Sequence, residues 1–218
     1  MKKAIVVGAT GLVGFHLVKL LLEDVRFGEV DVFVRRATGI VHPKLQEHLV
    51  DFTKPTDWQH LVKGDVLFLT LGTTRAKAGS KQAQYQVDHG FQFQFAAAAA
   101  RNMVPVLVLV SSAGANAGSA FFYMRMKGQL EQDIRGLPFR QTVIIRPGAL
   151  TGPREENRPA EKIGVGILRL INRIGLARKM RPIHGNTVAK AMVNACFREE
   201  TGIIVIEPQK VFKLAVGL

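Results

Sequence analysis

A short apolar run followed by three evenly spaced glycines opens the chain, and it constrains the fold more than any other feature. Residues 4–7 are apolar with β-branched members, which is typical of a buried parallel strand. Gly8, Gly11 and Gly14 follow at a spacing of three, and residues 12–22 continue with the apolar periodicity of a helix. A strand, a glycine turn and a helix in this order allow a pyrophosphate to approach the backbone at the helix N-terminus. The segment therefore predicts a nucleotide-binding turn.

The glycine spacing, GxxGxxG, differs from the common dinucleotide-binding pattern at Thr10, which takes the place of the second glycine. A glycine turn between a strand and a helix can also be purely structural, but the flanking strand and helix favour a nucleotide site. We expect the turn to contact the cofactor through Gly8, Thr10, Gly11, Leu12, Val13 and Gly14.

Two arginines follow the second predicted strand, residues 30–34. Arg35 and Arg36 lie about 20 residues beyond the last glycine, where NAD-specific proteins carry an acid that binds the ribose 2′-hydroxyl. An acid would repel a 2′-phosphate, whereas a guanidinium group can bind it through paired charge-assisted hydrogen bonds. Arginine is also common at a solvated strand end. Joined to the glycine turn, however, the pair favours NADP(H) as the cofactor.

Two further strand ends are expected at the same edge, because open α/β sheets bind ligands at the carboxyl ends of their strands. A short third strand is predicted at residues 49–52, with Asp51 and Phe52 near the expected adenine. An apolar fourth strand, residues 66–71, precedes a glycine that permits close approach and two threonines whose hydroxyls can bond phosphate or ribose. The predicted cofactor contacts here are Leu71, Gly72 and Thr73.

The remaining elements follow from apolar periodicity. Residues 75–80 are expected to form a mobile loop. Residues 81–102 are expected to form a helix, since the alanine run and the length of the segment outweigh the alternating phenylalanines within it. Further helices are predicted at residues 57–61 and 186–197, and further strands at residues 104–110, 141–146 and 202–206.

Tyr123 and Lys127 stand four apart in a segment that is expected to be helical, so both lie on one helix face. A free phenol, with a pKa of about 10, is a poor acid–base catalyst at neutral pH. A neighbouring ammonium group favours the phenolate and brings the phenol closer to that task. The preceding strand ends in Ser111 and Ser112, which can hydrogen-bond a reacting oxygen. An i, i+4 pair alone is common on helices, but after this strand end and the nucleotide turn it indicates a catalytic site.

Together these stretches resemble the short-chain dehydrogenases/reductases, and more narrowly their atypical branch related to the HIV Tat-interactive oxidoreductase. The resemblance implies an α/β fold of Rossmann type, with a doubly wound, mostly parallel sheet and helices on both faces. It also implies an NADP(H)-binding oxidoreductase with a Ser-Tyr-Lys site at the carboxyl edge. The matching stretches are residues 8–14, 71–75, 111–112, Tyr123 with Lys127, and residues 146–148.

The resemblance also implies a role for each site residue. Tyr123 is expected to donate or accept the proton, and Lys127 to bind the nicotinamide ribose and acidify Tyr123. Ser112 is expected to orient the carbonyl or hydroxyl, with Ser111 as the alternative. Pro147 opens a loop that passes beside the nicotinamide in relatives, and it is included among the cofactor contacts.

One position departs from the family. Many members carry an asparagine that supports a proton relay, in the helix before the catalytic strand. Asp88 stands at or near that position here. Either the aspartate holds a water in the same way, or the relay is absent.

The chain is expected to form one domain over residues 1–218, with a small substrate-side lid within about residues 149–185. Residues 161–174 are amphipathic, and their ordinary role would be to cover the substrate side of the sheet; a membrane-surface role is the alternative. The apolar runs fall short of the ~18 residues of a membrane span. No histidine–carboxylate set has convincing metal spacing, and His184 is expected to lie in a loop.

The net charge of +13 suggests nucleic-acid binding, but the sequence has no basic block, zinc-finger spacing or RNA-binding aromatic signature. We therefore expect a small-molecule substrate and no specific nucleic acid, with dispersed charge steering anionic ligands. The single cysteine, Cys196, excludes an internal disulfide. A cytoplasmic protein, monomeric or homodimeric, is expected.

The first functional hypothesis is an NADPH-dependent oxidoreductase acting on a small carbonyl or alcohol. A second, from another class, is an NADP(H)-binding regulatory or sensor protein with little turnover. The third is a nucleotide-sugar epimerase. It ranks last, because Arg35 and Arg36 argue against NAD and because few residues remain for a sugar-nucleotide domain.

Overall fold

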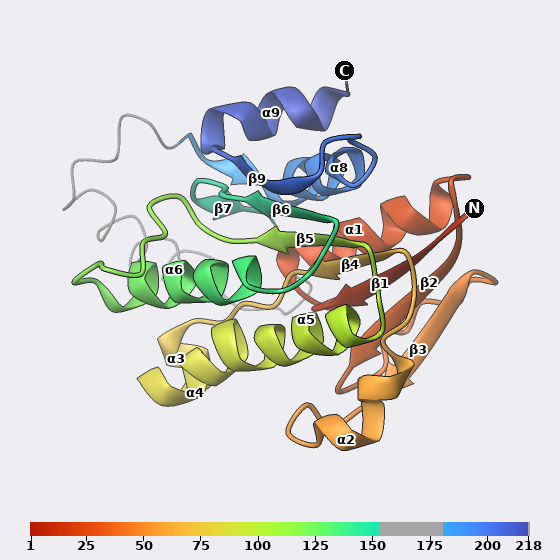
Figure 1. Ribbon diagram of the computed structural model, residues 1–218, viewed down its shortest axis with the longest axis horizontal. Helices are drawn as coiled ribbons and strands as arrows, with labels where there is room; N and C mark the ends of the chain where they lie inside the picture. Colours follow the sequence, from red (N-terminus) through yellow and green to blue (C-terminus); the bar gives the residue numbers. More distant parts are fainter. Residues whose placement is uncertain (153–180, 218) are drawn as a thin grey trace.

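The computed structural model describes residues 1–152 and 181–217, and seven parallel strands form its main sheet (Figure 1). The strand order is β3-β2-β1-β4-β5-β6-β9, and every neighbouring pair is parallel. The order reverses between β1 and β4, which is the switch point where doubly wound sheets bind their ligands. The strands are β1 (Lys2–Val7), β2 (Phe27–Val34), β3 (Leu45–Leu49), β4 (Val66–Leu69), β5 (Val106–Val110), β6 (Gln141–Ile145) and β9 (Gly202–Ile206).

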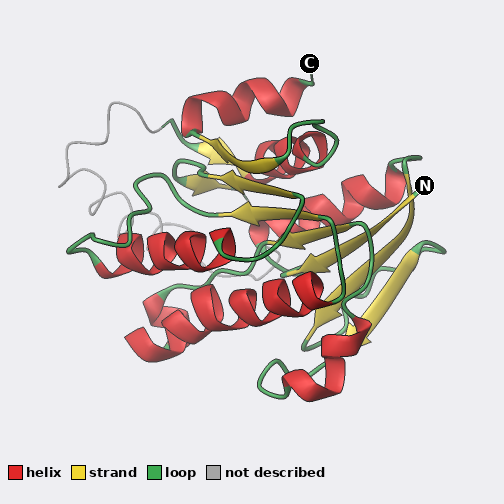
Figure 2. Ribbon diagram, in the orientation of Figure 1, coloured by secondary structure: helices red, strands yellow, loops and turns green. Residues whose placement is uncertain are grey.

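Helices cover both faces of the sheet, as Figure 2 shows. On one face α1 (Leu12–Glu23), α8 (Gly185–Ala195) and α9 (Pro208–Val216) pack on the strands; on the other lie α5 (Phe91–Arg101) and α6 (Phe122–Arg135). Alternate residues of each central strand enter opposite cores, so the buried stretches of these strands, such as residues 4–7 of β1, are apolar on both faces. The predicted Rossmann-type fold is confirmed.

Shorter elements complete the described part of the chain. Among them, α4, η2 and α5 together occupy the stretch predicted as one helix, and the phenylalanines at its centre pack in the core as expected. The elements are α2 (Pro55–Trp58), the 3₁₀ helix η1 (Gln59–Leu61), α3 (Arg75–Ala78), α4 (Lys81–Tyr85), the π-helix η2 (Gln86–Gly90), and the two-stranded parallel sheet of β7 (Leu150–Thr151) and β8 (Ile183–His184).

Three expectations were wrong or incomplete. The third strand is β3, four residues earlier than predicted, because this edge strand carries three consecutive polar residues between two leucines and lacks the apolar run that we sought. The predicted loop at residues 75–80 contains α3, where the Thr74 hydroxyl accepts a hydrogen bond from the Lys77 N–H (3.3 Å). His184 lies in β8 rather than in a loop, and β7 and α9 were not predicted.

The proposed lid can be compared with the structure only at its ends. Residues 153–180, which include the amphipathic segment 161–174, lie outside the described residues. The domain plan therefore stays a prediction. In the described ranges no helix is both long and apolar enough to cross a membrane.

Candidate functional site

The turn after β1 requires glycine at two of its three glycine positions. Gly8 has φ +99°, and a Cβ atom there would lie 2.6 Å from Thr70 Oγ1 and 2.8 Å from the Leu71 backbone nitrogen. A Cβ atom at Gly14 would collide with the Gly8 carbonyl oxygen. At Gly11 it would lie 3.2 Å from the same oxygen, a tight but less severe contact. The turn is therefore built by backbone-to-backbone packing.

The N-terminus of α1 faces this turn, and no side chain of the described residues caps it. Gly11 is the N-cap residue and supplies no side chain, and within residues 1–152 and 181–217 no acid occupies the first turn of the helix. Uncapped N–H groups and the positive end of the helix dipole favour a bound anion. Thr10 is exposed and Leu12 half-buried, whereas Val13 packs in the core, so only the backbone of Val13 is available to a ligand.

Arg35 and Arg36 are exposed directly after β2, at the edge that carries the glycine turn. The register pairs Val7 with Phe33, which places the two strand ends side by side. Arg35 makes no ion pair with any described residue. Its guanidinium group is thus available for an anionic ligand at this edge.

Asp51 and Phe52 follow β3, but they serve the fold as well. The Asp51 carboxylate accepts hydrogen bonds from the Thr53 N–H (2.9 Å) and hydroxyl (2.7 Å), which lower the pKa of this exposed carboxyl. The ring of Phe52 is buried and lies edge-on to Phe91 and Phe95, at centroid distances of 5.5 and 5.1 Å. The predicted cofactor contacts Asp51 and Phe52 stay predictions, and because the Phe52 ring is buried, a contact there would involve its backbone.

The loop after β4 is held at both ends. The Thr70 N–H and hydroxyl both donate to the Val7 carbonyl oxygen at 2.9 Å, which fixes β4 beside the glycine turn. Leu71 and Thr73 are half-buried and Gly72 is exposed. The Thr73 N–H donates to Asp88 Oδ2 at 2.8 Å. The predicted contacts Leu71, Gly72 and Thr73 thus lie at the switch point, next to the turn.

Tyr123 and Lys127 lie in the first half of α6, as predicted. This helix packs directly on the loop after β5, since a Cβ atom at Gly128 would collide with the backbone of Asn116 and Ala117. Lys127 is 3% exposed, and its Nζ lies 3.6 Å from Asp88 Oδ1. Tyr123 is half-buried, and its phenol has no hydrogen-bond partner in the described ranges. Its hydroxyl is therefore open to another molecule.

The two serines after β5 have different surroundings, which the sequence did not separate. Ser111 is buried, and its hydroxyl donates to Glu131 Oε1 at 2.5 Å. Glu131 in turn accepts two hydrogen bonds from Arg146, at 2.9 and 2.6 Å. Ser112 is half-buried and donates a longer hydrogen bond, 3.3 Å, to the carbonyl oxygen of Ala113. The Ser111 hydroxyl is engaged by Glu131, which pairs with Arg146, so Ser112 stays the predicted catalytic serine.

Pro147 is buried after β6, and its carbonyl oxygen accepts a hydrogen bond from the Ala113 N–H (2.9 Å). This bond joins the ends of β5 and β6.

Sequence reasoning missed Glu131, although its spacing of four from Lys127 places it on the same stripe of α6. In the described ranges no three His, Cys, Asp or Glu side chains gather where they could hold a metal ion.

Comparisons with known proteins extend these observations. A family model described as NAD(P)H-binding matches residues 8–198. The chain is 36% identical to "Protein fmp52, mitochondrial" of Aspergillus fumigatus, over 98% of this chain and 95% of that protein. It is 34% identical to "Protein FMP52, mitochondrial" of Candida albicans, over 98% of each. These names give no support to the narrower resemblance to Tat-interactive proteins.

Solved structures with the same fold are more distant in sequence. Bordetella bronchiseptica WbmH in complex with NAD+ aligns with a TM-score of 0.71 and 19% identity, over 95% of this chain and 76% of that one. A UDP-N-acetylglucosamine 4-epimerase from Methanobrevibacter ruminantium aligns with a TM-score of 0.68 and 18% identity, over 94% and 76%. At this identity the likeness shows the fold alone.

The expectation of a cytoplasmic protein was wrong. Relatives that match nearly the whole chain are named mitochondrial proteins, in several fungi. The expectation had relied on the presence of a single cysteine, which is equally compatible with other reducing compartments.

Proposed function

The chain belongs to the NAD(P)H-binding family, and from this premise we propose that it is an NADPH-dependent oxidoreductase that acts on a small carbonyl or alcohol. The observation that carries the proposal is the placement of α6. This helix brings Tyr123 and the buried Lys127 to the carboxyl edge of the sheet, where the glycine turn and the uncapped N-terminus of α1 also lie. A proton-transfer group and a nucleotide site thus share one edge.

NADP(H) is the proposed cofactor. Arg35 lies without an ion-pair partner among the described residues, beside the end of β1, and its guanidinium group suits a 2′-phosphate. The uncapped α1 N-terminus would receive the pyrophosphate, and Leu71, Gly72 and Thr73 would line the far side of the turn. Lys127 would bind the nicotinamide ribose.

When bound, the nicotinamide supplies a hydride to the substrate carbon or accepts one from it. The chain supplies the proton and the orientation. Tyr123 would hold or release the proton at its hydroxyl, which is open to another molecule, and the nearby Lys127 would favour the phenolate. Ser112 would hydrogen-bond the reacting oxygen, while Ser111 and Glu131 keep the strand end in place.

A binding protein that senses NADP(H) is the second candidate. Lys127 faces Asp88 in this structure, so its charge is partly engaged before any substrate arrives. A nucleotide-sugar epimerase is the third, because the solved structures of similar fold include proteins named as such. The exposed Arg35 and Arg36 argue against tightly held NAD, and this candidate stays last.

The decisive experiment follows NADPH oxidation by the purified wild type and by Tyr123→Phe, against a panel of aldehydes, ketones and quinones. Losing the proton carrier should lower the rate by about 10²–10⁴ and leave NADPH affinity nearly unchanged. Tyr85→Phe is the matched control, since Tyr85 is the other tyrosine of the chain; it ends α4 and stacks on His89 of η2. It should keep the wild-type rate.

The outcomes separate the candidates. Equal rates for the wild type and Tyr123→Phe would remove Tyr123 from the mechanism. NADPH binding without turnover on any substrate would favour the sensor. Interconversion of a UDP-sugar, with NAD retained through purification, would favour the epimerase.

Mitochondrial association is inferred from the names of the relatives, and fractionation of cells that express the tagged chain tests it. The oligomeric state, monomer or homodimer, is a separate prediction. Light scattering of the purified protein measures it directly.

A further inference from the structure

The connection between β2 and β3 is unusual for two neighbouring parallel strands. Such strands are normally joined by a crossover of about a dozen residues or more, most often with a helix in it. Here residues 35–44 join β2 to the edge strand β3 and contain neither a helix nor a strand (Figure 1). Because no regular hydrogen-bond ladder fixes these residues, their conformation depends on individual side-chain contacts.

Glu47 of β3 supplies such a contact in the first half of the connection. Its Oε1 accepts a hydrogen bond from the Thr38 N–H, at 3.0 Å, and another from the Thr38 hydroxyl. The same hydroxyl accepts a hydrogen bond from the Ile40 N–H at 3.1 Å, and Ile40 packs against the core. Hydrogen bonds to a carboxylate are stronger than those between neutral groups. Glu47 thus fastens residues 38–40 to the edge of the sheet.

The second half of the connection is held by other contacts. The Lys44 N–H donates to His42 Nδ1, and Lys44 Nζ donates to the Asp24 carbonyl oxygen, both at 3.1 Å. The Lys44 carbonyl oxygen in turn accepts a hydrogen bond from the Val30 N–H at 2.8 Å. These bonds fix the chain where it enters β3, whereas the Glu47 contacts act closer to Arg35.

Arg35 lies three residues before Thr38 and is exposed at the edge where NADPH is proposed to bind. A loop and a long side chain lose conformational freedom when they bind a phosphate, and a loop that is already ordered reduces this cost. Glu47 pairs with Val32 of β2, and an apolar side chain would suit this position as well. It would also not oppose a bound phosphate by its charge. Packing alone therefore does not account for the acid.

From these contacts we propose that Glu47 is a positioning residue for cofactor choice, which orders the connection after β2 so that Arg35 faces the 2′-phosphate of NADPH. The proposal rests on the proposed function and deepens it, because it adds a determinant of cofactor specificity on β3. Glu47 would act through Thr38 and the backbone of residues 35–38, so it is not itself expected to touch the cofactor. NADH has no 2′-phosphate, and its affinity should not depend on this order.

The test compares Glu47→Ala with Glu47→Gln. Both hydrogen bonds from Thr38 go to Oε1, so glutamine keeps an acceptor oxygen and loses only the charge, whereas alanine loses the oxygen as well. Fluorescence titration measures the dissociation constants of NADPH and NADH. We expect Glu47→Ala to bind NADPH about fivefold more weakly, with NADH affinity unchanged, because the loop must then be ordered on binding. Glu47→Gln should keep its NADPH affinity within about twofold of the wild type.

Gln46→Ala is the matched control. Gln46 precedes Glu47 on the same strand and is exposed, and its side chain leaves the strand on the opposite face because side chains alternate along a strand. The variant should bind both cofactors like the wild type. A loss of NADPH affinity equal to that of Glu47→Ala would assign the effect to any change in β3 and would overturn the proposal.

A double variant decides whether Glu47 acts through Arg35. If it does, Glu47→Ala added to Arg35→Ala should weaken NADPH binding no further than Arg35→Ala alone. Hydrogen exchange in the absence of cofactor measures the order of the loop directly. The amides of residues 35–40 should exchange faster in Glu47→Ala than in the wild type, and Glu47→Gln should remain close to the wild type. Unchanged NADH affinity shows that each variant is folded.

Three results would overturn the proposal while the proposed function stands. The first is wild-type NADPH affinity in Glu47→Ala, and the second is a gain in that affinity, which would mean that the acid only repels the phosphate. The third is full additivity with Arg35→Ala. A wild type that binds NADPH no more tightly than NADH would be a different failure, since the proposed cofactor choice would then fall and the role of Glu47 with it.

Discussion

The two halves of the carboxyl edge are built in different ways. Around β1, β4 and α1 the backbone itself makes the site, because Gly8 and Gly14 leave no room for a Cβ atom and the Thr70 hydroxyl bonds the Val7 carbonyl oxygen. Around β5 and α6 charged side chains hold the elements together. Glu131 joins Ser111 to Arg146, and Asp88 joins Lys127 to the loop after β4.

The difference fits what the proposed function would require of each half. A pyrophosphate is recognised by backbone N–H groups, so its site needs the chain to come close and tolerates no side chain. Proton transfer needs a few side chains at fixed positions, and buried ion pairs hold them at a cost in desolvation. An added methyl group should therefore destabilise the half around β1, β4 and α1. Removal of a charge should destabilise the half around β5 and α6.

The largest effect is expected for Gly14→Ala in the backbone-built half. Its methyl group would collide with the Gly8 carbonyl oxygen, and backbone cannot move aside cheaply. We expect a loss of about 3 kcal/mol or more in the free energy of unfolding, with NADPH binding lost. Urea unfolding measures the change. Gly118→Ala is the control, since its Cβ would lie 3.5 Å from Asn116 Oδ1, and a loss as large there would contradict the backbone argument.

The side-chain-built half is tested by Glu131→Gln. Glutamine keeps an acceptor for Ser111 but leaves the Arg146 guanidinium with one carboxylate, Glu207, at 3.0 Å. Because Arg146 is partly exposed and keeps that partner, we expect a loss of about 2 kcal/mol, below the value for a fully buried pair. Turnover should fall as well, since α6 and the end of β5 lose their connection.

Glu200→Gln is the matched control for this change, because Glu200 pairs with Arg198 at the exposed surface. Thermal unfolding should show no difference from the wild type. If the two variants behaved alike, the Glu131 ion pair would not be what holds this half together.

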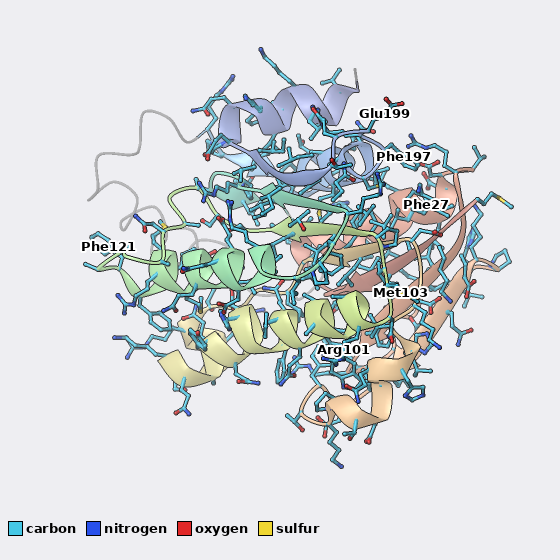
Figure 3. All side chains as sticks on the ribbon, in the orientation of Figure 1. Phe27, Arg101, Met103, Phe121, Phe197 and Glu199 are labelled. Atoms are coloured by element: carbon cyan, nitrogen blue, oxygen red, sulfur yellow. The ribbon has the colours of Figure 1, made fainter. Side chains whose placement is uncertain are left out.

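Arg35→Ala tests the proposed preference for NADPH and leaves the residues of the glycine turn unchanged. The wild type should bind NADPH more tightly than NADH, and the variant should lose about tenfold in NADPH affinity while NADH affinity stays the same. Arg101→Ala is the control, since Arg101 ends α5 and Figure 3 shows it well away from Phe121 at the start of α6. Equal affinity of the wild type for the two cofactors would contradict the prediction.

The smallest change in the free energy of unfolding is expected at Met103, a non-glycine residue in a backbone conformation that favours glycine. Met103 has φ +60° and is 86% exposed, in the turn between α5 and β5. Met103→Gly should raise the free energy of unfolding by about 0.5–1 kcal/mol, because glycine adopts this conformation without strain and little packing is lost. Met103→Ala keeps the strain and should give no gain; an equal gain would assign the effect to the loss of the exposed side chain.

Local patterns predicted most of the central sheet, because a strand buried on both faces is apolar throughout and stands out in the sequence. They failed at the periphery. The edge strand β3 is polar at three of its five residues and was placed four residues late. The short helix α3 depends on the Thr74 cap rather than on apolar periodicity, and α9 begins at Pro208, a start signal that we did not use.

By itself, the sequence determined the glycine turn, the order of the strands along the chain and the Tyr123–Lys127 face of α6, since each depends on residues within about one turn or one strand of each other. Only the tertiary structure gave Ser111 and Ser112 different hydrogen-bond partners, placed the ring of Phe52 in the core, and set Asp88 against Lys127. Each of these depends on which side chain a distant element presents. Glu131 is 20 residues from Ser111 and Lys127 is 39 from Asp88, and no local pattern specifies contacts between residues so far apart in the chain.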